Sequence, residues 1–368
     1  MLIYILVFFS TYFFMKLAEK KDGNRKKIIL LIAILLPSIL AGVRDYSVGS
    51  DTSGYVLNWF YNAVHMRDIK VYLLNAVVSD IAFLYALLNY IVASFTSNPH
   101  WFLFVFYFIE MLILFKAVYD NKDIIDPGLA ILTYFFMFYN LSLNAARQSM
   151  ALVIVLYSFK YIRQKKLLHF LIAIVAAMLF HSSAVIAFSL YFIARVVEGR
   201  LKNVVKLLLY IGLTFIIIGY RYLVATLVKI NFISDRYLSY ITETLRGGGY
   251  ERIFLLCIPV IILSISAIKL YDKNQIKIKS YLSTYLGFSL IISLVAFVYT
   301  YAVRMAYYFD IMLVIYLPFL ARNIKFKFKV EERNFNILII IGYIIIYWFI
   351  VFVIRENGET VPYLFMRS

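Results

Sequence analysis

Lysine and arginine residues gather in six short clusters, and each cluster lies between apolar stretches long enough to be helices buried in lipid. The clusters are Lys16–Lys27, Lys116–Lys122, Lys160–Lys166, Arg195–Lys206, Lys269–Lys279 and Arg322–Arg333. They contain 25 of the 37 Lys and Arg residues of the chain. Positive charge marks the cytoplasmic side of a membrane protein, so the spacing predicts a bilayer crossing between clusters and both chain ends outside.

The composition agrees with an all-α polytopic integral membrane protein. Hydrophobic residues make up 64% of the chain and charged residues only 15%, a balance far from that of soluble domains. The net charge of +17 is best explained by basic residues that face anionic lipid, and nucleic acid is rejected as a partner. Cys257 falls in an apolar stretch, so neither a disulfide framework nor a cysteine-rich metal site is available.

The chain is expected to form a single transmembrane domain, residues 1–368, with about twelve spans. Their approximate bounds are 2–18, 28–42, 99–119, 127–143, 146–162, 167–180, 182–195, 204–219, 252–269, 280–301, 303–321 and 335–354. The first is expected to remain as a span because its basic cluster follows it. Short or broken helices are expected over 165–200. Asn98-Pro99 and Asp126-Pro127 predict capped helix starts.

Two long loops are expected on the outer side. Loop 43–98 contains the apolar stretch Ile81–Phe95, which is expected to be an interfacial helix that lies flat or dips in and returns. A crossing there would invert the next span and break the charge pattern. Loop 220–251 is expected to carry a second interfacial helix. Its mixed segment Asp235–Arg246 beside three glycines fits either a lid over a membrane-side cavity or an ordinary surface loop.

Polar residues also gather at the span ends that the charge pattern places outside. They are Arg44, Asp45, Asp51, Arg147, Gln148, His181, Ser182, Ser183 and Arg304. Any one arginine could simply reach headgroup phosphate, and His181 could be an interfacial histidine. Arg147, however, lies among small residues that let helices approach closely, which favours a position facing the bundle interior. Three arginines converging on one cavity would suit a lipid diphosphate, because guanidinium groups fork onto phosphate oxygens.

The sequence offers few other reactive groups. His181 and the two aspartates are the available proton acceptors, and the Asp45 and Asp51 pair could alternatively hold a divalent cation. No Walker loop or dinucleotide glycine fingerprint follows a strand, so the energy for a reaction must come from the substrate. Glu110 and Asp310 lie within spans and are expected to be paired internally, with Asp310 supporting Arg304.

Five sequence blocks resemble, in their order, the successive motifs of EpsG-family proteins. The blocks are residues 44–55 (RDYSVGSDTSGY), 147–151 (RQSMA), 180–184 (FHSSA), 304–309 (RMAYYF) and 361–363 (VPY). EpsG-family proteins are Wzy-type polymerases of bacterial surface polysaccharides. The resemblance implies a fold similar to GT-C glycosyltransferases and a polymerase that joins undecaprenyl-diphosphate-linked oligosaccharide repeats on the outer face of the cytoplasmic membrane.

The expected mechanism is glycosyl transfer between two lipid-linked substrates, without cofactor or metal. Arg44, Arg147 and Arg304 are predicted to hold the donor diphosphate and stabilise the charge that develops on it. His181 or Asp51 is predicted to accept the hydroxyl proton, with Asp45 orienting a partner and His181 preferred. Secondary substrate contacts are predicted for four further residues of the same regions, Gln148, Tyr55, Ser183 and Tyr308.

Other classes of membrane protein fit parts of this pattern. A flippase for the same lipid-linked sugar should carry ionisable residues near the bilayer midplane and show related halves, whereas here the charges gather at one face and no repeat is visible. A polysaccharide ligase would differ only in its acceptor. A membrane acyltransferase would need chemistry facing the cytoplasm. A chain-length regulator and a flippase of the same pathway are the expected protein partners.

Overall fold

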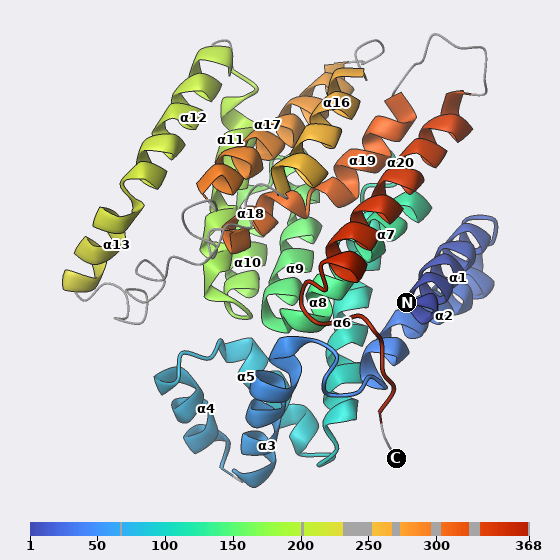
Figure 1. Ribbon diagram of the computed structural model, residues 1–368, viewed down its shortest axis with the longest axis vertical. Coiled ribbons are helices and arrows are strands. Elements are labelled where there is room, and N and C mark those ends of the chain that lie inside the picture. The colour runs from blue at the N-terminus through green and yellow to red at the C-terminus, as the bar shows by residue number, and fades with distance from the viewer. Residues whose placement is uncertain are drawn as a thin grey trace. The chain divides into compact units, whose positions relative to one another are not determined.

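The computed structural model describes residues 1–66, 68–199, 202–230, 252–266, 273–295, 303–323 and 332–366 (Figure 1). Within these ranges the regular elements are helices, apart from one isolated antiparallel bridge between Arg44 and Phe365. The chain divides into two compact units. Unit 1 comprises Met1–Val185, Leu317–Arg322 and Arg333–Ser368, and unit 2 comprises Ile186–Tyr316 and Asn323–Glu332. The single domain expected from the sequence stays a prediction.

Unit 1 is built from long helices that coincide with the expected spans. They are α1 (Leu2–Glu19), α2 (Gly23–Gly42), α6 (Pro99–Tyr119), α7 (Pro127–Tyr134) continued by η2 (Phe135–Tyr139) and α8 (Asn140–Asn144), α9 (Ala146–Arg163), α10 (Leu167–Met178) and α20 (Glu332–Trp348) continued by η6 (Phe349–Ile354). Helix α1 packs against α2, α2 against α6, α6 against α9 and α9 against α10 (Figure 1). Helices α6 and α9 thereby form the centre of the unit.

Two helix starts in unit 1 show why the sequence breaks where it does. The Asn98 side chain accepts a hydrogen bond from the backbone N–H of His100 at 2.9 Å, and that of Asp126 accepts from Leu129 at 3.0 Å. In each case proline follows the cap, where its missing N–H costs nothing. Both capped starts predicted from the sequence are confirmed.

Unit 2 contains shorter helices. They are α11 (Phe188–Val196), α12 (Lys202–Ile218), α13 (Tyr220–Lys229), η4 (Ile253–Cys257) continued by α16 (Ile258–Ser266), α17 (Lys273–Val295) and α18 (Val303–Asp310), after which α19 (Leu313–Asn323) passes from unit 2 into unit 1. Helix α17 contacts α11, α12, α18 and η4. The 3-10 turn η3 (Ser182–Ala187) joins α10 to α11, so the short helices expected over 165–200 are confirmed.

Several described helices are able to span a membrane. Leu2–Glu19, Pro99–Tyr119 and Asn334–Ile354 are long and apolar enough to cross, and the pair Val303–Asp310 and Leu313–Asn323, bent by 44°, adds a fourth if it counts as one span. Shorter apolar helices accompany them, and the chain is a membrane protein. The total of about twelve spans and the GT-C-like fold stay predictions, because many of the helices are shorter than a perpendicular crossing requires.

The two expected outer loops have different outcomes. Loop 43–98 folds into η1 (Thr52–Val56), α3 (Leu57–His65), α4 (Ile69–Val78) and α5 (Phe83–Ala93). The helix expected near Ile81–Phe95 is therefore present as α5, while its interfacial position stays a prediction. In loop 220–251 the structure describes α13 and the residue after it, and the expected lid segment Asp235–Arg246 and its glycines lie outside the described residues.

One end of unit 1 collects basic residues from several of the sequence clusters. Lys16 Nζ lies 2.6 Å from the Asp126 carboxylate, which joins the last turn of α1 to the start of α7. Lys26 Nζ lies 5.5 Å from the centre of the Tyr119 ring, which joins α2 to α6. These contacts place the C-terminal ends of α1 and α6 beside the N-terminal ends of α2 and α7.

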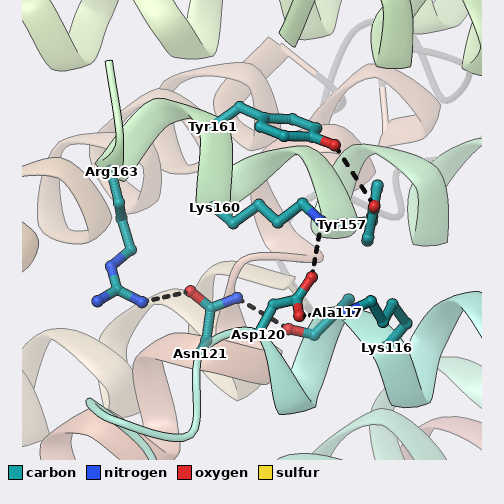
Figure 2. Close-up of polar contacts among 8 residues, drawn as sticks. All are labelled: Lys116, Ala117, Asp120, Asn121, Tyr157, Lys160, Tyr161 and Arg163. Atoms are coloured by element: carbon teal, nitrogen blue, oxygen red, sulfur yellow. Dashed lines mark hydrogen bonds and ion pairs between the residues drawn. The ribbon is translucent and has the colours of Figure 1, made fainter. Parts of the chain in front are cut away.

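The same end continues onto α9 and α19. Lys116 and Lys160 share the Asp120 carboxylate at 2.6 and 2.7 Å (Figure 2). Arg163 forms an ion pair with Asp123. Arg322 of α19 donates to the backbone carbonyl of Asp123 at 2.9 Å. We call this region, defined by Lys16, Lys26, Lys116, Lys160, Arg163, Arg322 and their aspartates, the basic end of unit 1. That it faces the cytoplasm stays a prediction.

Candidate functional site

Arg44 is fully buried just beyond the end of α2, where it joins four segments of unit 1. One terminal nitrogen of its guanidinium donates to the Ala41 carbonyl at 3.1 Å. The other donates to Thr52 Oγ1 at 3.3 Å, the Leu143 carbonyl at 3.3 Å and the Tyr107 hydroxyl at 3.4 Å. These four acceptors are uncharged, and through them Arg44 holds η1, α6 and α8 around the end of α2. Its predicted role as a diphosphate ligand stays a prediction.

The loop that carries Arg44 approaches α8 very closely. Gly49 has φ of +93°, and a Cβ atom on it would come within 2.5 Å of the Leu143 carbonyl oxygen. Only glycine adopts this conformation without strain and leaves room for that oxygen. Tyr107 donates to the Ser142 carbonyl at 2.6 Å and so braces the same end of α8.

The C-terminal segment 355–366 pairs with this loop. The backbone N–H of Asp45 donates to the Leu364 carbonyl at 2.9 Å, and that of Gly49 donates to the Glu359 carbonyl at 3.0 Å. The last of the five sequence blocks therefore lies beside the first, although more than 300 residues separate them in the chain.

Side chains tie the C-terminal segment to the surrounding helices. Tyr363 donates to the Leu40 carbonyl at 2.6 Å, and Tyr4 donates to the Thr360 carbonyl at 2.6 Å. Asn140 Nδ2 donates to the Thr360 hydroxyl at 2.9 Å. The segment thus packs onto α1, α2 and α8, and it holds the loop around Arg44 in place against these helices.

The two aspartates of the first block have different surroundings. The Asp45 carboxylate accepts hydrogen bonds from the Ser47 N–H at 3.0 Å and hydroxyl at 2.7 Å. Asp51 is held through its backbone, because its N–H donates to Asn144 Oδ1 at 3.0 Å. The Ser50 hydroxyl donates to the same oxygen at 2.8 Å. Within the described parts of the chain, the half-buried Asp51 carboxylate receives no hydrogen bond. Asp51 is therefore better placed than Asp45 to accept a proton.

Arg147, in the first turn of α9, lies against aromatic rings. Its guanidinium carbon is 4.3 Å from the centre of the Tyr55 ring and 5.8 Å from that of Tyr85. Among the described residues it makes no hydrogen bond or ion pair, and it is half-buried. Ring faces hold a guanidinium without using its N–H groups. Arg147 thus keeps its donors available for an anion.

Tyr55 links Arg147 with Asp51 electrostatically. Burial raises the pKa of Tyr55, the Arg147 charge lowers it, and the charges of Asp51 and Asp80 raise it. Arg147 and Asp51 therefore lie within electrostatic reach of the same phenol. Tyr55, predicted as a secondary substrate contact, is a central residue of this cluster.

His181 follows the end of α10 in the same unit. Its Nδ1 lies 2.8 Å from the Ser183 hydroxyl, which fixes the orientation of the imidazole. Two residues earlier, the Leu179 carbonyl accepts from the backbone N–H of Leu84 at 2.8 Å. Leu84 precedes Tyr85, whose ring lies near Arg147. The segment that carries His181 is therefore attached to the helix that supports Arg147. We call the region defined by Arg44, Asp51, Tyr55, Arg147 and His181 the motif end of unit 1.

The buried carboxyl group of Glu110 contacts α9 two residues from Arg147. Glu110 of α6 accepts hydrogen bonds from the Tyr134 hydroxyl and, at 2.9 Å, from the Ser149 hydroxyl. The internal pairing expected for Glu110 is thereby confirmed. Gln148, another predicted substrate contact, is also buried. Glu110 supports the site without being exposed to it.

Arg304 and Tyr308 lie on α18, in unit 2, where Arg304 is exposed and Tyr308 is buried. Asp310 of the same helix forms an ion pair with Arg252 and accepts a hydrogen bond from Ser289. Internal pairing of Asp310 is thereby confirmed, and Arg252, which carries no sequence motif, is its ion-pair partner. The predicted convergence of Arg304 with Arg44 and Arg147 joins residues of two units and stays a prediction.

Several supporting residues had no distinctive sequence signal. Tyr85 and Tyr107 are two of 32 tyrosines, and Asn144 lies three residues before Arg147 without a motif of its own. Arg252 begins an expected span and resembles an ordinary interfacial arginine. Within the described ranges no three His, Cys, Asp or Glu side chains are grouped as a metal site would require.

The motif end and the C-terminal segment contain four of the five blocks noted in the sequence. No curated protein and no solved structure matches the chain. The sequence model of the EpsG family matches residues 27–365, which confirms the resemblance and includes all five blocks. The family is linked to exopolysaccharide biosynthesis. The chain belongs to the EpsG family.

Proposed function

We propose that this protein is a polysaccharide polymerase that joins undecaprenyl-diphosphate-linked oligosaccharide repeats at the outer face of the cytoplasmic membrane. The observation that carries the proposal is the state of Arg147. Its guanidinium is positioned by the Tyr55 and Tyr85 rings and has no carboxylate partner among the described residues. A guanidinium held in this way can fork onto two phosphate oxygens.

In the proposed reaction a sugar hydroxyl of one lipid-linked repeat attacks the anomeric carbon of the growing chain. The bond between that carbon and the diphosphate oxygen breaks, and its electron pair leaves with the undecaprenyl diphosphate. Arg147, with Arg304, stabilises the negative charge that builds on this leaving group. Arg44 positions the loop that carries Asp51, because its described hydrogen bonds are to protein oxygen atoms.

The hydroxyl proton passes to His181 or Asp51. Neutral imidazole is an effective base near pH 7, and the Ser183 hydroxyl at 2.8 Å orients the His181 ring. Asp51 supports the alternative assignment, since its carboxylate is free of hydrogen bonds within the described residues and it shares Tyr55 with Arg147. We favour His181 as the base and assign Asp51 to the acceptor sugar.

Reconstitution in liposomes with a defined undecaprenyl-diphosphate-linked repeat tests the function. Gel analysis should show a ladder of products that differ by one repeat, together with released undecaprenyl diphosphate. Movement of intact substrate across the bilayer without a ladder would instead identify a flippase. Transfer of one finished chain to a different acceptor would identify a ligase. Either result would overturn the proposal.

A further inference from the structure

A groove of about 510 Å³ opens between α6, α9 and α10, away from the motif end. Its polar lining consists of Lys116, Tyr157, Tyr161 and His169. The Tyr157 and Tyr161 hydroxyls are 3.4 Å apart (Figure 2). The Tyr161 and His169 rings lie 5.4 Å apart. These four side chains form the polar section of the groove, which can contact a polar headgroup.

The rest of the lining is apolar, and it is ordered along the helices. On α6, Leu112 lies one turn before Lys116, and on α9, Ile154 lies about one turn before Tyr157. Helix α10 leaves the basic end, and on it Ala176 lies two turns beyond His169. All three helices therefore become apolar in the same direction, away from the basic end.

The polar section also carries an excess of positive charge. Lys116 and Lys160 share the single carboxylate of Asp120, at 2.6 and 2.7 Å, which leaves one positive charge in the triad (Figure 2). Lys160 is packed on the Tyr157 ring at 3.7 Å with 13% of its side chain exposed, whereas the Lys116 side chain is 60% exposed. Lys116 is thus the cation that can turn toward a ligand in the groove.

We propose that this groove binds one anionic phospholipid of the surrounding leaflet. Its phosphate would contact Lys116 and the Tyr161 and His169 side chains, and an acyl chain would lie along Leu112, Ile154 and Ala176. The order of polar and apolar residues matches the order of headgroup and tail in a phospholipid, and the excess charge matches one phosphate. The proposal is independent of the enzymatic activity, because the groove shares no residue with the motif end.

Native mass spectrometry of the protein released from nanodiscs of dioleoylphosphatidylglycerol and dioleoylphosphatidylcholine tests the assignment. The wild-type protein should retain one phosphatidylglycerol in preference to phosphatidylcholine. The variant with Lys116→Gln and His169→Gln should retain it roughly fivefold less, because headgroup attraction is lost. Ala176→Trp, which fills the apolar section, should lower retention of both lipids. Lys122→Gln, which removes an exposed basic residue outside the groove, is the matched control.

Three outcomes would overturn the proposal. Equal retention of the two lipids by the wild-type protein would show that the groove does not distinguish an anionic headgroup from a zwitterionic one. Equal losses in Lys122→Gln and in the groove variant would attribute the effect to the general surface potential. Displacement of phosphatidylglycerol by equimolar undecaprenyl phosphate would assign the groove to a polyprenyl lipid. Unfolding midpoints measured on every variant ensure that the comparison is between folded proteins.

Discussion

At the basic end of unit 1 most of the cations contact carboxylates, whereas at the motif end Arg44 and Arg147 contact uncharged oxygen atoms and aromatic rings. Lys16, Lys160 and Arg163 each form an ion pair with an aspartate. Arg44 donates to carbonyl and hydroxyl oxygens, and Arg147 lies on the Tyr55 ring. The carboxylates neutralise the cations that they contact at the basic end, whereas at the motif end the N–H groups of Arg147 are left for an anionic ligand.

The difference also has an energetic side. Burying Arg44 without a carboxylate costs several kcal/mol of desolvation, which its hydrogen bonds must offset. A chain that needed only stability would gain more from an apolar residue there. At the basic end the pairs are partly exposed, so each contributes at most about 1 kcal/mol. Burial of Arg44 thus makes the motif end costly to fold, as we expect of the proposed substrate site.

The largest expected effect is on the proton acceptor at the motif end. His181→Ala should lower the rate of ladder formation by roughly 10²–10⁴ and leave binding of the lipid-linked substrate nearly unchanged. Asp51→Asn should be milder. Single-turnover rates and substrate affinity, measured together, check this ranking. A dead Asp51→Asn beside an active His181→Ala would transfer the role of base to Asp51.

How far the sequence predicts this site depends on the distance between the interacting residues. The caps at Asn98 and Asp126 act within three residues, so the dipeptides with proline were enough to place two helix starts. The burial of Arg44 depends on Tyr107 and Leu143, which lie 63 and 99 residues away. Nothing local distinguishes such an arginine from one that reaches a headgroup.

The same limit applies to charge pairing. The basic clusters were evident from composition alone, because each is a local run of lysines and arginines. The pairing of Asp310 with Arg252, 58 residues away, depends on how η4 and α18 pack against α17 and could not be predicted from the residues themselves. The sequence blocks therefore predict where a site lies, whereas the contacts of each arginine depend on packing between distant segments.

The second expected effect concerns the framework at the motif end. Arg44→Lys keeps the charge but loses the guanidinium hydrogen bonds to η1 and α8. The free energy of unfolding should therefore fall by about 2 kcal/mol. Thermal unfolding in detergent measures the change, and Gly49→Ala should act in the same direction. Normal stability with lost activity would instead show that Arg44 contacts the substrate diphosphate directly.

A smaller effect is expected at the basic end. Asp123→Asn removes the ion-pair partner of Arg163. The Asp123 side chain is 58% exposed in this pair. Stability should fall by no more than about 1 kcal/mol, and ladder formation should be unchanged. Chain-length distributions of the variant and wild type, compared at equal protein levels, test this. A shortened ladder would show that the basic end also contributes to polymerisation, which contradicts the proposed difference between the basic end and the motif end.

The smallest effect is the dependence of the basic end on pH. Burial would raise the pKa values of Asp120 and Asp123, but hydrogen bonds from Lys116, Lys160 and Arg163 hold both below the ordinary range. Their stabilisation is therefore complete above the ordinary aspartate pKa of about 3.9 and is lost as pH falls through the lowered values. Hydrogen exchange of residues 116–123 should be protected equally from about pH 5 to 8, after correction for intrinsic rates. Loss of protection between these values would contradict the assigned pairs.

Equilibrium binding of undecaprenyl diphosphate to purified protein tests the central claim, that the motif end leaves Arg147 available to a lipid diphosphate. Arg147→Lys keeps the charge without the fork and should weaken binding by about tenfold or more. Arg163→Lys, the same change at the basic end, should bind as the wild-type protein does. Equal affinities of Arg147→Lys and wild type would contradict the account, as would an equal loss in both variants.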